Sequence, residues 1–357
     1  MLPRMLPPIA YLDFAGRWFG QVRYDLATSG VRPIAAAELG PCGADDYGAR
    51  ERFAQVLSAR YGVPRAEVAP CLGATGAVYA ACAAVLQPGA RVLIESPVYE
   101  PLWRIPASLG ARVDRIERRA ESGYRLEVSR VLGALTPETR LCIITDPHNP
   151  TGVELDRGEL AELARVLAER GVYLLVDEVY RELGDPGWSA RKLGGTVLAC
   201  SSATKCWGLP WARAGFLLAP SSIVERVVTL ERYVVGLAPP ASMAWGELAA
   251  RRADELVERA RGTQAGKRAL VDEFMLQAQA KLIWEPPPSH AVYGWVRSRD
   301  GAVLTDALER GIETHEVVVA PGVYFGDPAA FRLSWTAEVS RVREGLAALG
   351  RVLGVTS

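Results

Sequence analysis

The sequence predicts an α/β fold, with a large domain built on a mainly parallel sheet covered by helices and a smaller α+β domain formed by both termini. Between residues 47 and 218, short apolar runs alternate with helical patterns, which is the order of a parallel sheet with helical crossovers. From about Pro240 the pattern changes to Ala/Arg/Glu-rich helices, a proline-rich break, short strands and a terminal amphipathic helix. The first forty residues show no strand-helix alternation. We therefore expect a large domain over 40–240 and a small domain from 1–39 and 241–357.

The buried strands of the large domain are expected at five apolar runs. These are RVLIES (91–96), RLCIIT (140–145), VYLLVD (172–177), TVLACS (196–201) and AGFLLA (214–219). Each run is followed by a loop with polar or glycine-rich residues, and open α/β sheets bind their ligands at such loops. A functional crevice is therefore expected along the loops.

The composition excludes several classes of function. The 357 residues carry 41 basic and 41 acidic side chains, so no field of one sign attracts nucleic acid or an anionic membrane. The N-terminal residues contain prolines where a signal peptide needs a continuous apolar run, and no segment has the length of a membrane span. The six cysteines form no CxxC pair or Cys/His cluster, so neither a zinc site nor a disulfide framework is indicated. We expect a cytoplasmic protein with no nucleic-acid or membrane partner.

A first candidate ligand site lies in the segment PCLGATGAVYA. Gly73, Ala74 and Thr75 begin a helix of small residues, where free N–H groups and a hydroxyl can converge on a phosphate. The same pattern also begins dinucleotide-binding units, and Glu95 ends the next apolar run, where a ribose-binding acid would lie. Against that alternative, bulky Tyr79 fills the third small position. No tyrosine precedes any of the four lysines by four residues, as a dehydrogenase of that type would need.

Two further strand ends carry reactive side chains. Asp177 ends the run 172–177 and Tyr180 follows it, although a strand-terminal Asp is more often a helix cap and the tyrosine can be a core residue. Lys205 follows the run 196–201, and its simplest interpretation is a surface lysine. However, a lysine that follows hydroxyl residues directly after a buried strand is an amine able to form a Schiff base.

The lysine segment resembles that of the class I/II aminotransferases, which are pyridoxal-phosphate (PLP) enzymes of fold type I. The similar residues are Ser202-Ala203-Thr204-Lys205, then Gly208-Leu209-Pro210, then Arg213-Ala214-Gly215. The resemblance extends over nearly the whole chain, in the family's order of motifs. It implies that Lys205 forms the imine with PLP and shuttles the α-proton, and that Ser202, Thr204 and Arg213 hold the phosphate.

The resemblance assigns four more residues to the cofactor. Asn149 in DPHNPTG is the only asparagine of the chain, and it occupies the position that hydrogen-bonds the phenolic oxygen of PLP; its alternative role is that of a turn residue. Asp177 resembles the acid that pairs with the pyridine nitrogen, so that the ring can accept electrons. Tyr180 resembles the phenol that shares the phenolic oxygen with Asn149. Tyr99 in SPVYEP resembles the aromatic residue that stacks on the ring.

The same resemblance assigns residues to the substrate and to a second subunit. Arg332 in FRLSW matches the arginine that binds the substrate α-carboxylate through a planar, bidentate fork. Gly30 in LATSGVRP resembles a glycine near that carboxylate, although a simple turn glycine explains it as well. Tyr47 in ADDYGARERF resembles a tyrosine that reaches the phosphate of the neighbouring subunit, in a segment shorter than usual. A homodimer with active sites at the interface is implied.

The implied activity is transfer of an amino group from an amino acid to a 2-oxo acid. The same residues also serve lyases and cyclases that act on amino acids in specialised metabolism, and this alternative stays open.

Tyr99 argues against acyl-CoA-condensing synthases, which generally stack a histidine on the ring. About forty residues without a basic helix leave no room for the DNA-binding segment of a transcriptional regulator. No arginine is assigned to a second substrate carboxylate, and four aromatic residues either line an apolar substrate pocket or pack in the core: Trp18, Phe19, Trp207 and Trp211.

Overall fold

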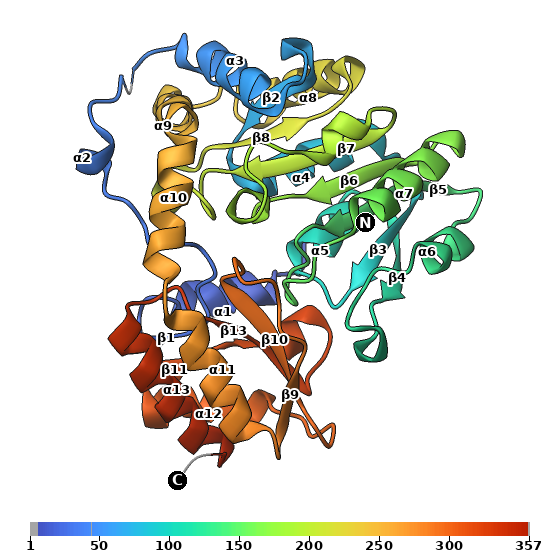
Figure 1. Cartoon of the computed structure of the whole chain (residues 1–357). Helices are drawn as coiled ribbons and strands as arrows, with labels where there is room; N and C mark the ends of the chain where they lie inside the picture. The colour runs from blue at the N-terminus through green and yellow to red at the C-terminus, as the bar shows by residue number, and fades with distance from the viewer. Residues whose placement is uncertain (1–5, 44, 356–357) are drawn as a thin grey trace.

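The computed structural model describes residues 6–43 and 45–355 and contains a large seven-stranded sheet (Figure 1). Its strand order is β2-β8-β7-β6-β5-β3-β4. All neighbours pair in parallel except β8, which is antiparallel to both of its neighbours. The predicted α/β fold with a mainly parallel sheet is confirmed. The strands are β2 (Val68–Cys71), β3 (Arg91–Ser96), β4 (Arg112–Glu117), β5 (Thr139–Thr145), β6 (Tyr173–Asp177), β7 (Val197–Ser202) and β8 (Gly215–Leu218).

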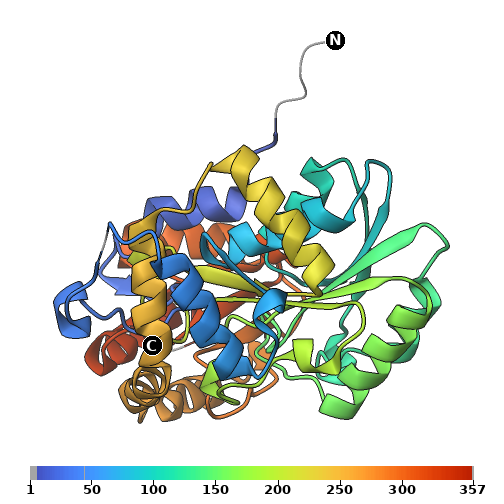
Figure 2. The same ribbon diagram turned by 90° about the horizontal axis from the view of Figure 1, so that it is seen from above.

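Helices cover both faces of this sheet, as the view from above shows (Figure 2). Successive strand residues point to opposite faces, so Leu175 packs on one side and Leu174 on the other. The first side is covered by α4 (Gly73–Val85), α5 (Pro101–Ser108) and α8 (Ser221–Val234). The second side is covered by α3 (Ala49–Tyr61), α6 (Val128–Ala134), α7 (Arg157–Glu169) and α9 (Pro240–Arg251).

A four-stranded antiparallel sheet, in the order β12-β13-β10-β9, forms the second unit together with segments from both ends of the chain. Near the N-terminus, β1 (Tyr24–Asp25) pairs in parallel with β11 (Val317–Val318). The backbone N–H of Ser334 donates to Leu26. The remaining elements of this unit are α1 (Ala10–Trp18), β9 (Leu282–Trp284), β10 (Tyr293–Ser298), β12 (Ala320–Pro321), β13 (Ala330–Ser334), α11 (Lys267–Ala278), α12 (Thr305–His315) and α13 (Val339–Leu353). The short helix α2 (Ala36–Leu39) lies in the connection to the large sheet.

Helices α9 and α10 (Ala253–Gln264) pack against the large unit, although the expected boundary at residue 241 assigns them to the small one. Met243 shares a buried cluster with Phe53 and Phe216. A Cβ atom on Gly246 would lie 2.7 Å from the Phe53 ring, so α9 and α3 approach closely because this position carries no side chain. We therefore propose that the C-terminal part of the small unit begins near residue 266.

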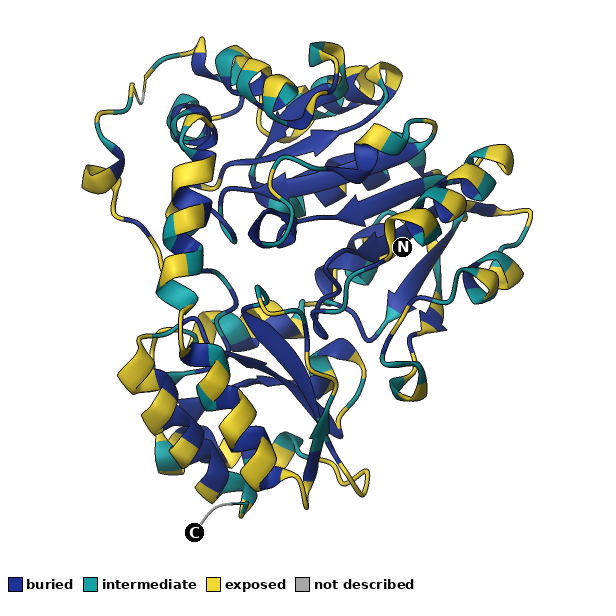
Figure 3. Ribbon diagram, in the orientation of Figure 1, coloured by how far each residue is buried: buried dark blue, intermediate teal, exposed yellow. Residues whose placement is uncertain are grey.

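Buried residues make up most of the strands of both sheets except the edge strands β4 and β9, and exposed residues lie on the outer faces of the helices (Figure 3). Five cysteines are buried and Cys42 is partly buried, and all six are free thiols. No cluster of potential metal ligands occurs within residues 6–43 and 45–355. Among the helices of these residues, none has the length and apolar character needed to cross a bilayer.

Candidate active site

Most of the predicted site residues line one cavity of about 320 Å³ at the carboxyl ends of β6 and β7. Helices and loops of the large unit form most of its wall. Helix α1 and strand β13 complete it with Tyr11, Leu12 and Arg332. The predicted residues that line it are Ala74, Thr75, Tyr99, Asn149, Asp177, Tyr180, Ser202, Thr204, Lys205, Arg213 and Arg332.

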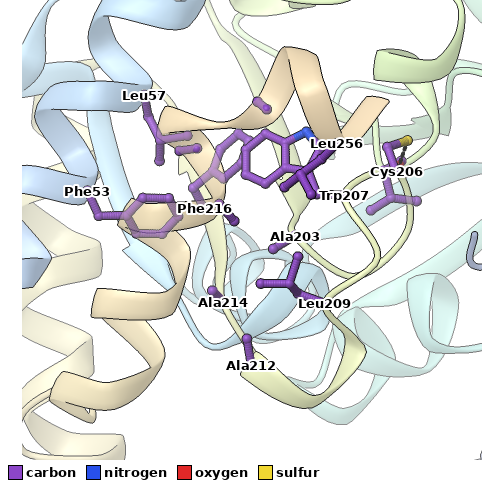
Figure 4. Close-up of a cluster of buried hydrophobic side chains, with 14 of the residues drawn as sticks. Phe53, Leu57, Ala203, Cys206, Trp207, Leu209, Ala212, Ala214, Phe216 and Leu256 are labelled. Carbon is purple, nitrogen blue, oxygen red and sulfur yellow. Dashed lines mark hydrogen bonds between the residues drawn. The ribbon is translucent and has the colours of Figure 1, made fainter. Parts of the chain in front are cut away.

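The loop after β7 presents Lys205 to the cavity because its neighbours are anchored in the core. Ala203, Cys206, Trp207 and Leu209 are buried and pack with residues of α3, β8 and α10 (Figure 4). With these side chains on the core side, the amine of Lys205 is directed into the cavity. Burial lowers the pKa of this amine, so more of it is uncharged and nucleophilic at neutral pH.

Asp177 ends β6 and lies inside the same cavity. Its carboxylate accepts one hydrogen bond from the described residues, from the backbone N–H of Val179 at 3.2 Å. Burial raises the pKa of Asp177 to about 6, and the positive charge of Lys205 opposes that effect. A buried carboxylate that accepts so few hydrogen bonds from its surroundings is suited to pair with a cationic group of a ligand.

Tyr180 and Asn149 contribute a phenol and an amide to the cavity. The Tyr180 Oη lies 2.6 Å from the Oγ of Ser29, and burial raises the pKa of the phenol to about 12. The Asn149 Oδ1 accepts a hydrogen bond from Arg332 at 2.8 Å. Asn149 therefore does more than terminate a turn, because its side chain connects the large unit to β13.

Arg332 is buried on β13 and carries a guanidinium that pairs with no carboxylate of the described residues. It donates to Asn149, to the Tyr11 Oη at 2.9 Å and to the carbonyl oxygen of Ala27 at 3.0 Å. Its Nε has no hydrogen-bond partner within the described residues. A buried cation without an anion is a natural place for a ligand carboxylate.

A second anion site lies at the first turn of α4. The backbone N–H groups of Ala74 and Thr75 are among those that a helix leaves unpaired at its N-terminus. Arg213 lies beside them and makes no hydrogen bond or ion pair with a described residue. A Cβ atom on Gly73 would lie 2.7 Å from the Arg213 Nη2, so a side chain here would displace the end of this guanidinium, and the φ of +71° at this position also favours glycine. With the Ser202 and Thr204 hydroxyls, these groups fit a dianionic phosphate.

Three predicted residues lie outside the lining. Gly73 packs directly against the guanidinium of Arg213, as described above. A Cβ atom on Gly30 would lie 3.5 Å from the Thr204 carbonyl oxygen, so this glycine borders the lysine loop. Tyr47 is 76% exposed and does not line the cavity of its own chain.

The acid that a dinucleotide site would need already has partners within the protein. Glu95 is buried, forms an ion pair with Arg118 at 2.6 Å and accepts the N–H of Thr145 at 2.6 Å. This carboxylate is therefore unavailable for a ribose, which removes the main support for that alternative.

The four aromatic residues considered for a substrate pocket pack elsewhere. Trp207 belongs to the core below the lysine loop, and Trp211 donates to the Ile34 carbonyl oxygen. Trp18 and Phe19 pack in the cluster around α1. The apolar wall of the cavity includes instead Leu12, Val78, Pro101, Leu102, Ile105 and Val179.

Two functional candidates, Tyr11 and Ser29, were missed by the sequence reasoning. Tyr11 contacts Arg332 from α1, and its backbone N–H donates to the Glu100 Oε2 at 2.7 Å. Ser29 contacts both Tyr180 and Lys205. Both residues belong to the first forty positions, which show no motif except the glycine that follows Ser29.

Comparisons with known proteins agree with this geometry. The family model "Aminotransferase class I and II" matches residues 46–349. Capreomycidine synthase of Streptomyces vinaceus is 26% identical over 99% of this chain and 95% of its own length. The aspartate/prephenate aminotransferase of Thermus thermophilus is 28% identical over 79% of this chain and 74% of its own length.

Two solved structures resemble the whole chain. A PLP-dependent aminotransferase from Streptococcus suis has a TM-score of 0.89 and 25% identity, with 99% of each chain covered. The PLP-dependent cyclase OrfR has a TM-score of 0.85 and 27% identity, again with 99% of each chain covered. These findings confirm the predicted fold type I and imply PLP as the cofactor, and the lining residues fit its phosphate and its ring. The chain therefore belongs to the class I and II aminotransferase family.

Proposed function

We propose that this protein is an aminotransferase, which moves an amino group from an amino acid to a 2-oxo acid. The observation that carries the proposal is the convergence of Lys205, Asp177 and Arg332 in one cavity, although they come from three separate parts of the chain. An amine, a buried acid and an unpaired guanidinium are the groups that this chemistry needs.

The two ends of the cavity would hold the two ends of PLP. Arg213, Thr204 and the first turn of α4 would hold the phosphate, and Asp177 would hold the ring nitrogen. Tyr180 and Asn149 would hold the phenolic oxygen. Bound PLP supplies a reversible covalent link to amines and an electron sink for the bond broken at the α-carbon.

The chain's own residues would bind the substrate and move its proton. Arg332 holds the α-carboxylate and so fixes which bond at the α-carbon faces the cofactor. The Lys205 Nζ would take the α-proton as a base, and its lowered pKa favours the unprotonated form that this task needs. Ionised Asp177 keeps a proton on the ring nitrogen. Tyr11 lines the cavity beside Arg332 and would help to hold its guanidinium in place, because the Tyr11 Oη accepts one of its hydrogen bonds.

The lining favours amino donors with apolar side chains. Within the described residues, the charged side chains of the cavity are Asp177, Lys205, Arg213 and Arg332, and each has a role above. The rest of the wall is largely apolar, and burying a second charge against it without a partner would be costly.

A cyclase is the second candidate, and it rests on a specific observation. Two of the proteins that align with nearly the whole chain are capreomycidine synthase and the cyclase OrfR. Cyclisation or elimination would start from the same α-proton transfer by Lys205, and the products distinguish the outcomes.

The decisive experiment mixes the PLP-loaded protein with each amino acid in turn and follows the visible absorption of the bound cofactor. Transamination predicts bleaching with stable pyridoxamine phosphate and one equivalent of 2-oxo acid. Release of ammonia without pyridoxamine phosphate, or a cyclic product, would support the second candidate instead. Lys205→Ala should abolish the absorption, whereas Lys192→Ala, a lysine whose amine donates to the Gly187 carbonyl oxygen, should retain it. A colourless wild-type protein would refute both candidates.

A homodimer is part of the proposal. The end of α8 and the residues after it expose a patch of apolar side chains, in which Tyr233 is 87% and Leu237 is 71% exposed. An apolar groove next to it is lined by Tyr79 and Leu230. Exposed patches of this kind mark protein interfaces, and a second copy of the chain would cover it. In such a dimer, exposed Tyr47 would reach the neighbouring phosphate. The expected cytoplasmic location stays a prediction.

A further inference from the structure

Ser29 lies between the two groups of the site that exchange protons. Its side chain is buried, with 2% of the residue exposed. Its Oγ lies 2.6 Å from the Tyr180 Oη, and the Lys205 Nζ donates to it at 3.3 Å. One hydroxyl therefore bridges the phenol and the amine.

The backbone around Ser29 is fixed on both sides. Before it, the carbonyl oxygen of Thr28 accepts the hydroxyls of Ser334 at 2.8 Å and of Thr336 at 2.7 Å. After it, the N–H of Val31 donates to the Lys205 carbonyl oxygen at 3.0 Å. The hydroxyl of Ser29 is therefore held at a set distance from the lysine loop.

Among the residues that the structure describes, Ser29 gives the amine and the phenol their one hydrogen bond each. Within the described residues, neither the Lys205 Nζ nor the Tyr180 Oη has a hydrogen-bond partner other than Ser29. A serine hydroxyl has one proton and two lone pairs. It can accept from a protonated lysine and donate to the phenol, or accept from the phenol and donate to a neutral amine. Ser29 therefore satisfies both partners in either protonation state.

We propose that Ser29 is a positioning residue, which directs the Lys205 amine and the Tyr180 hydroxyl into the cavity whenever the lysine is not bound to the cofactor. The inference rests on one part of the proposed function, namely that the Lys205 amine reacts with PLP. Removing the hydroxyl would leave a buried amine and a buried phenol without a partner, so the amine would adopt other directions and lose part of its reactivity.

The test measures the rate at which cofactor-free protein takes up PLP, followed by absorbance from pH 6 to pH 9. Ser29→Ala should slow uptake by about fivefold to tenfold, the effect of one lost hydrogen bond, and should move the midpoint of the pH profile. Ser29→Thr keeps the hydroxyl and should stay within twofold of wild type. Ser58→Ala removes a hydroxyl of α3 that donates to the Val63 carbonyl oxygen, outside the cavity, and should change nothing.

A second pair of variants separates the hydroxyl from the packing. Ser29→Thr and Ser29→Val have the same shape, so any steric strain is shared and the ratio of their uptake rates reports the hydroxyl alone. The loss in Ser29→Ala should also be smaller in a Tyr180→Phe background, because the two residues act through one contact.

Equal uptake rates and pH profiles for the Thr and Val variants would overturn the proposal, as would a wild-type profile for Ser29→Ala. The measurement needs no amino donor. A protein that takes up PLP normally but transfers no amino group would contradict the proposed function and leave the inference on Ser29 intact. A protein that transfers amino groups normally, and whose Ser29→Ala variant takes up PLP at the wild-type rate, would overturn the inference on Ser29 and leave the proposed function intact.

Discussion

Protonation of Asp177 should weaken PLP binding in acid, because the pKa of this buried carboxyl is about 6 instead of its usual 3.8. With that pKa, about 97% of Asp177 is ionised at pH 7.5 and about 9% at pH 5.0. Only the ionised acid pairs with a protonated ring nitrogen. The contribution of Asp177 to PLP affinity should therefore fall by about tenfold over this range. Burial determines both the direction of this effect and the pH range in which it occurs. A raised carboxyl pKa means that Asp177 loses its charge closer to neutral pH.

The assay titrates cofactor-free wild type and Asp177→Asn with PLP at several pH values and compares their dissociation constants. Lys205 titrates in both proteins, so the ratio of the two constants isolates Asp177. At pH 7.5 the variant should bind at least about tenfold more weakly, the worth of a hydrogen bond to a charged group, and the ratio should approach one near pH 5. A ratio that is independent of pH would refute the reasoning, because Asp177 would then be ionised throughout or uninvolved.

Three further predictions concern substrate binding, stability and assembly. Arg332→Lys keeps the charge but loses the planar fork, so kcat/KM should fall by about 30-fold to 1000-fold; steady-state kinetics showing less than a threefold change would contradict the carboxylate role. Burial raises the pKa of Glu178 from 4.5 to about 8, so its stabilising contribution is complete below pH 4.5 and is lost as the pH rises through 8. Glu178→Gln should therefore unfold at a higher temperature than wild type at pH 8 and at the same temperature near pH 4.5, and equal melting temperatures at pH 8 would exclude this. Leu237→Asp should yield monomers in sedimentation, whereas Leu276→Asp, on 64% exposed Leu276 of α11, should leave a dimer; a monomeric wild type would disprove the interface.

The buried centre of the large sheet could be predicted because its strands are continuous apolar runs. The run 172–177 corresponds to β6 (Tyr173–Asp177), and the run 214–219 contains β8 (Gly215–Leu218). The edge strand β4 (Arg112–Glu117) escaped prediction because most of its side chains are exposed or half-buried and charged. An edge strand has little need for an apolar run, so composition alone does not identify it.

The candidate site could be predicted where its residues follow buried strands. Asp177 and Lys205 each stand at or just after a strand end, which made them candidates, and the resemblance of their segments to the aminotransferase family assigned their roles. Tyr11 and Ser29 reach the cavity only through contacts with residues far along the chain, such as Arg332 and Tyr180. Likewise, the helical pattern after residue 240 predicts helices but not which unit they pack against, because an apolar stripe does not identify its partner.

The pairing of β1 with β11 has a consequence for biosynthesis. When Tyr24 leaves the ribosome, its partner Val317 has not yet been made. At typical rates of about 5–20 residues per second, the N-terminal segment waits about 15–60 seconds for that partner. Arg332, which donates to the Tyr11 Oη and completes the cavity, is made later still. The large unit can fold during translation, whereas the cavity can form only after nearly the whole chain has been synthesised.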